Sequence, residues 1–76
     1  MFITITLKIG DDKIDIRIDS EQKISVGLEV LRESGKMIGG KMPSYFRSKQ
    51  RERLVSTYRT FQDEGIYDGD VLEAIE

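Results

Sequence analysis

The sequence predicts one α+β domain over residues 1–76, in which a β-hairpin and further short strands form a sheet against one helix. Apolar and polar residues alternate strictly near the start, as is typical of strands. The apolar period then lengthens to that of an amphipathic helix. The second half holds short apolar runs between glycine and aspartate turns. A chain of 76 residues has room for one modest core.

The first expected element is a hairpin of two alternating strands. Residues 2–9 (FITITLKI) place four apolar side chains on one face: Ile3, Ile5, Leu7 and Ile9. Residues 10–12 (GDD) supply turn chemistry, and residues 13–19 (KIDIRID) alternate again through Ile14, Ile16 and Ile18. The isoleucine-rich face of this hairpin must be covered by another element.

A helix within residues 20–37 is expected to provide that cover. Ile24, Leu28 and Leu31 follow each other at i, i+4 and i+7 and form one apolar stripe. Ser20 or Ser25 would cap its start, and Gly35 suits the residue that closes it. Gly27 inside the first turns weakens the helix by roughly 1 kcal/mol.

The second half is expected to complete the sheet. Residues 36–44 form a loop around Gly39-Gly40 and Pro43, with some of Met37, Ile38 and Met42 packed under the sheet. The further expected elements are a strand at 45–49 (YFRSK), a turn at 50–53, a strand at 54–56 (LVS), a one-turn helix at 59–66 capped by Thr60 and ended by Gly65, and a last strand at 71–76 (VLEAIE).

Composition excludes several classes of chemistry. The chain has no histidine and no cysteine, which rules out the usual zinc sites, imidazole bases and disulfides. The sequence contains no pattern that indicates a nucleophile–base pair, so we expect neither an enzyme nor a cofactor. The longest apolar run is far short of the roughly 20 residues that span a bilayer. The start, MFITITLKIGDD, alternates and does not resemble a signal peptide, so we expect a soluble, cytoplasmic protein without membrane insertion.

The order of elements resembles the β-grasp arrangement of ubiquitin over the full length. The second half resembles the YukD/EsaB family of bacterial ubiquitin-like proteins, which are associated with type VII (WXG100) secretion systems. The residues that carry this resemblance are Ile66-Tyr67-Asp68-Gly69-Asp70-Val71-Leu72. It implies a mixed four- to five-stranded sheet packed on one helix. It also implies an accessory or regulatory role in secretion, with a secretion-system membrane component or its cytosolic domain as the partner.

The end of the sequence bears on conjugation. Ubiquitin and related sulfur carriers act through a slim, unstructured Gly-Gly tail. This sequence ends Ala74-Ile75-Glu76 without a glycine after Gly69. We therefore expect a strand there, and neither conjugation nor sulfur transfer. The alternative that remains open is a β-grasp auxiliary subunit of a multicomponent enzyme such as an oxygenase, which a neighbouring catalytic chain would reveal.

A basic segment is the candidate site. Residues 41–59 carry six basic residues and one acid, although the whole chain has a net charge of −2. Four of the basic residues recur at i+2: Arg47, Lys49, Arg51 and Arg53. They are interpreted either as a docking face for an acidic protein surface or as a charged face that prevents association of sheet edges. A net acidic chain without an RNA motif is not expected to bind nucleic acid.

Resemblance to ubiquitin places Arg47 near the centre of the apolar patch that ubiquitin receptors recognise. A receptor of that kind should not bind this protein, because it would bury an unpaired arginine. Leu72 and Ala74 are expected to face the core, leaving Val71 and Ile75 near the basic strand. Val71 and Ile75 are either part of a mixed interaction surface or part of the core.

Two further motifs have competing interpretations. Asp63, Glu64, Asp68 and Asp70 are interpreted as turn and cap residues rather than calcium ligands, because the twelve-residue ligand pattern is absent. Gly39-Gly40-Lys41 is interpreted as a connector rather than a phosphate loop, because the Walker pattern is absent.

Overall fold

The computed structural model describes residues 1–33 and 45–75. Within them lie five strands and one helix: β1 (Phe2–Ile9), β2 (Asp12–Asp19), α1 (Ile24–Glu33), β3 (Tyr45–Ser48), β4 (Arg53–Ser56) and β5 (Val71–Ile75). The predicted closing glycine Gly35, the loop around Gly39-Gly40 and residue Glu76 lie outside the described residues. The predicted hairpin, helix and short strands are confirmed.

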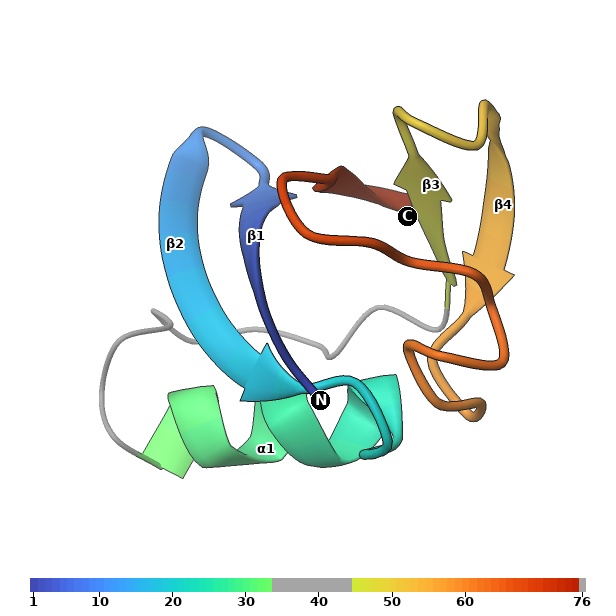
Figure 1. Ribbon diagram of the computed structural model, residues 1–76. Coiled ribbons are helices and arrows are strands. Elements are labelled where there is room, and N and C mark those ends of the chain that lie inside the picture. Colours follow the sequence, from blue (N-terminus) through green and yellow to red (C-terminus); the bar gives the residue numbers. More distant parts are fainter. Residues whose placement is uncertain (34–44, 76) are drawn as a thin grey trace.

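The strands form one mixed sheet in the order β2-β1-β5-β3-β4. β1 pairs with β5 in parallel, and the other neighbouring pairs are antiparallel. The helix lies across one face of the sheet, and the opposite face of the sheet carries no described helix (Figure 1). β2 and β4 are therefore the two edge strands, whereas β3 lies inside the sheet.

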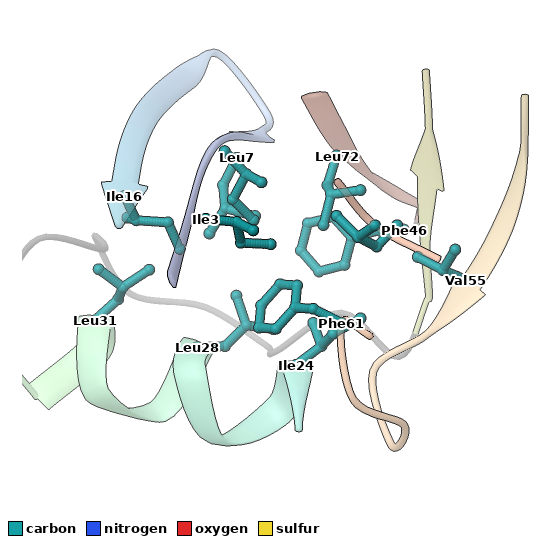
Figure 2. Packing of buried hydrophobic residues seen from close by; sticks show 12 residues of the cluster. Ile3, Leu7, Ile16, Ile24, Leu28, Leu31, Phe46, Val55, Phe61 and Leu72 are labelled. Carbon is teal, nitrogen blue, oxygen red and sulfur yellow. The ribbon is translucent and has the colours of Figure 1, made fainter. Parts of the chain in front are cut away.

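The core lies between α1 and the sheet (Figure 2). The predicted apolar stripe of the helix is confirmed, since Ile24, Leu28 and Leu31 are all buried. They face strand residues from both halves of the chain and the ring of Phe61, which comes from the segment after β4. Burial of these side chains supplies the main free energy that holds helix to sheet.

The start of α1 differs from the prediction. The helix begins at Ile24, so Ser25 lies in its first turn and Ser20 lies four residues earlier, and neither occupies the capping position. The amide N–H groups of Ile24 and Ser25 donate instead to the carbonyl oxygens of Arg59 (2.9 Å) and Thr57 (2.7 Å). The loop after β4 thus satisfies amides that a helix start otherwise leaves unpaired.

The one-turn helix predicted at residues 59–66 is present only as a single hydrogen-bonded turn, in which the Glu64 N–H donates to the Thr60 carbonyl at 3.1 Å, and not as a regular helix. The expected capping bond is nevertheless present: the Asp63 N–H donates to Thr60 Oγ1 at 2.9 Å. Gly65 follows with a φ of 72°, in the left-handed region that favours glycine. The backbone of residues 57–62 also forms hydrogen bonds with the backbone of residues 20–25, before and at the start of α1. These bonds explain why residues 57–62 follow an irregular path.

Candidate functional site: the outer face of the sheet

Arg47 lies on the outer face of the sheet, which is the face away from α1. β3 alternates as predicted, with Tyr45 and Arg47 exposed and with Phe46 and Ser48 buried. Pairing places Arg47 directly opposite Leu54 on β4 and opposite Glu73 on β5. Among the described residues, the Arg47 guanidinium has no hydrogen-bond or ion-pair partner. Arg47 is therefore an available cation in the middle of the sheet.

Besides Glu73, large apolar side chains lie near this arginine. Leu54 is 54% exposed, Tyr45 is 51% exposed, and Ile75 is 41% exposed. Tyr45 pairs directly with Ile75, so these two side chains lie one step along the sheet from the Arg47 row. We call Tyr45, Arg47, Leu54 and Ile75 the Arg47 patch.

Sequence reasoning found Arg47 and Ile75 but missed Leu54 as a surface residue. The signal is the pairing of Leu54 with Arg47, which fixes its side of the sheet. The neighbouring Val55, by contrast, is fully buried opposite Phe46. The sequence does not contain this register, and without it Leu54 looks like a core residue.

Lys49 and Val71 lie beside the patch, nearer to β1. Lys49 begins the turn after β3, and its amide N–H donates to the Val71 carbonyl at 3.0 Å. Its ammonium lies 3.7 Å from Oε1 of Glu73, in an exposed ion pair. Val71 is half-buried, on the opposite side of β5 from the buried Leu72, as predicted.

Arg51 points away from this face. Its Nε donates to the Gly65 carbonyl at 2.7 Å, and its guanidinium stacks 4.5 Å from the centre of the Tyr67 ring. The side chain therefore joins the β3–β4 turn to the segment that leads into β5. Such a stacked and hydrogen-bonded arginine contributes to the fold.

Arg53 is also used inside the fold. It pairs with Ser48 and so belongs to the inner face of the sheet. Its guanidinium donates to the Glu64 carbonyl and lies 3.6 Å from the Glu64 carboxylate, which is buried and also lies 3.3 Å from Arg59. The single basic face expected from the i+2 spacing is not formed, because the chain turns between β3 and β4 and sends Arg51 and Arg53 towards residues 64–67.

The Ile66–Leu72 motif has a clear physical role at the edge of the site. Asp70 is fully buried, and its carboxylate accepts hydrogen bonds from the Ser48 hydroxyl (2.5 Å) and the Gln50 N–H (3.1 Å). Asp68 accepts the Thr4 N–H at 2.6 Å. Gly69, with a φ of 86°, donates its N–H to the Thr4 carbonyl. The side chains predicted to serve local turns and caps thus make longer-range contacts: Asp68 and Asp70 join β1, β5 and the β3–β4 turn, and Glu64 pairs with Arg53 and Arg59.

Comparison with solved structures identifies the class of fold. The ubiquitin-like domain of an Arabidopsis thaliana protein superposes with a TM-score of 0.70 at 15% identity, over 97% of this chain and 76% of that one. The EccD5 ubiquitin-like domain from Mycobacterium xenopi gives a TM-score of 0.54 at 19% identity, over 100% of this chain and 97% of that one. The protein thus has the ubiquitin-like β-grasp fold.

Sequence comparisons do not assign the chain to a family. No protein-family model matches the chain, and no curated protein matches it significantly. In the described part of the chain, α1 is too short and too polar to cross a membrane.

Proposed function

We propose that this protein is a non-catalytic, ubiquitin-like protein-interaction module that docks through the Arg47 patch. One observation carries the proposal: an arginine without a partner among the described residues lies between exposed Tyr45, Leu54 and Ile75. Arginine and tyrosine are enriched among residues that dominate binding energy at interfaces. Contiguous exposed apolar side chains are typical of contact surfaces.

The competing interpretation, a charge that prevents association of sheet edges, fits Arg47 poorly. The edges of this sheet are β2 and β4, whereas Arg47 lies on β3, between β4 and β5. A charge that protects an edge should lie on the edge strand. The partner that fits the patch presents a carboxylate to Arg47 and an apolar rim to the side chains around it, because an unpaired arginine would be costly to bury.

We further propose that the module is an accessory or regulatory component of a type VII (WXG100/ESX-type) secretion system and acts in the cytoplasm. Its partner would be a membrane component of that system or the cytosolic domain of one. The resemblance of residues 66–72 to the YukD/EsaB family motivates this assignment. The likeness in fold to the domain of EccD5, a type VII secretion component, supports it.

Site-specific photocrosslinking tests the docking surface. A photoreactive phenylalanine analogue replaces Tyr45 in the patch or, as the matched control, Tyr58, which is 69% exposed but lies outside the patch. In the native cell, we expect the Tyr45 protein to form an adduct with a secretion-system membrane component and the Tyr58 protein to form none. Adducts of equal yield from both positions would contradict docking through the patch.

Charge reversal gives the second arm of this experiment. Arg47→Glu should abolish capture of the partner, whereas Arg32→Glu, in the last turn of α1 and away from the patch, should preserve it. Undiminished capture by folded Arg47→Glu protein would refute the docking surface. Recovery of a soluble oxygenase or adenylating enzyme instead would refute the secretion role and favour the auxiliary-subunit alternative.

A further inference from the structure

Three lysines from separate parts of the chain line a hollow on the outer face, beside the Arg47 patch. Lys8 comes from β1, Lys13 from β2 and Lys49 from the β3–β4 turn. The hollow has a volume of about 360 Å³, and Thr6, Asp15 and Val71 complete its lining. We call it the lysine hollow.

Two of the lysines repel each other across the sheet, although Lys8 also lies opposite Glu73 in the parallel β1–β5 pair. Lys8 and Lys13 are directly opposite in the antiparallel β1–β2 pair. Like charges in that position destabilise a sheet. Neither ammonium has an ion-pair partner among the described residues. An anion placed in the hollow would relieve this repulsion.

Carboxylates near the hollow already have partners. Asp15 accepts a hydrogen bond from the Thr6 hydroxyl at 2.5 Å, and Glu73 pairs with Lys49. Three lysines and these two acids leave a net positive charge, on a chain whose total charge is negative. The half-buried Val71 adds an apolar surface that the methylene groups of a glutamate can contact.

We propose that the lysine hollow binds glutamate or aspartate side chains of an acidic, extended segment in the partner protein. The partner's chemistry follows from charge complementarity together with position, since Lys49 and Val71 line the hollow and also lie beside the Arg47 patch. The inference rests on the proposed docking function and extends it: the patch binds the apolar part of the partner, and the hollow binds the acidic part. A volume at the low end for ligand pockets suits a few side chains better than a large cofactor.

Titration with a synthetic peptide tests the inference without knowledge of the partner. The probe is Ac-EVEEVE-NH2, added to the 15N-labelled full chain, and the control peptide has glutamine in place of every glutamate. We expect the acidic peptide to shift the amide resonances of Thr6, Lys8, Lys13, Lys49 and Val71, and the glutamine peptide to shift none of them. Affinity should fall as salt rises from about 50 to about 300 mM, since exposed charges are screened.

A pair of variants assigns the binding to the lysines. Lys8→Gln/Lys13→Gln should weaken peptide binding at least about fivefold, the change expected from loss of about 1 kcal/mol. Lys23→Gln, an exposed lysine just before α1, should leave binding unchanged. The double variant removes the repulsion between Lys8 and Lys13 together with the attraction of Lys8 to Glu73, so its stability should stay close to that of the wild type, and lost binding cannot then be attributed to unfolding.

The outcomes separate this inference from the proposed function. Equal binding of both peptides, or shifts confined to other residues, would overturn the lysine hollow. Stronger shifts at the same amides with inorganic phosphate or duplex DNA would assign it to phosphate and also overturn the inference. Capture that is lost in Arg47→Glu but retained in the double lysine variant would leave the docking patch standing without the hollow. Capture that is retained in Arg47→Glu but lost in the double lysine variant would refute the docking patch and leave the lysine hollow standing.

Discussion

At the scale of single residues, the buried carboxylate of Asp70 connects the site to the fold. It accepts hydrogen bonds from a side chain on β3 and from the backbone of the following turn. The Ser48 hydroxyl in turn accepts the Arg51 N–H at 3.1 Å. The turn that positions Lys49 and Arg51 is therefore held by one carboxylate from the motif before β5.

Asp70→Ala should destabilise the protein by about 3 kcal/mol, because it removes bonds to an acidic group and leaves buried donors unsatisfied. Asp68→Ala is the matched control. It removes one exposed bond, to the Thr4 N–H, and should cost about 1 kcal/mol or less. Urea denaturation followed by circular dichroism measures both. Equal losses in the two variants would mean that burial of Asp70 has no special role.

At the scale of elements, close approach of α1 to β2 depends on Gly27. A Cβ atom at this position would lie 2.4 Å from Cδ1 of Ile18. The sequence suggests only that Gly27 weakens the helix, because propensity is a local property. The contact with Ile18 becomes visible only once helix and sheet are packed together.

A double-mutant cycle tests this packing role. Gly27→Ala alone should bring little or no gain in stability, because displacement of the Ile18 methyl group offsets the higher helix propensity of alanine. In an Ile18→Val background, which removes that methyl group, the same substitution should stabilise the protein by about 1 kcal/mol. Thermal and urea unfolding of the four proteins give the coupling energy. Additive effects would show that the two residues do not constrain each other.

The elements also show where prediction from sequence ends. Alternation in residues 45–48 predicts both the strand and its faces, because a strand repeats every two residues. The cap of α1 could not be predicted, because its partners are carbonyl groups of Arg59 and Thr57, more than thirty residues away. The lysine hollow depends on the register of three chain segments, which no local pattern contains.

At the scale of the whole molecule, the structure divides the positive charge of the described residues 45–59 into two groups. Arg51, Arg53 and Arg59 contact the segment from Glu64 to Tyr67. Arg47 and Lys49 lie on the outer face. The i+2 spacing predicts a basic segment correctly, but a turn between its members decides which charges support the fold and which are available to a partner.

This division makes a prediction about stability. Arg53→Glu would place a carboxylate beside the buried Glu64, whose existing contacts are a backbone N–H and two arginines. The variant loses favourable interactions and gains a repulsive one, so its free energy of unfolding should fall by about 2 kcal/mol. Arg47→Glu, an equal change of charge, places an exposed carboxylate opposite Glu73 and should lower the free energy of unfolding by about 1 kcal/mol or less.

Urea denaturation at one ionic strength compares the two variants directly. A loss in Arg47→Glu as large as that in Arg53→Glu would mean that Arg47 also supports the fold, and its exposed position would no longer argue for docking. A stable Arg53→Glu protein would mean that the Glu64 cluster contributes little. With the expected result, loss of partner capture in Arg47→Glu reports on the interface, because the smaller loss of stability leaves that variant folded.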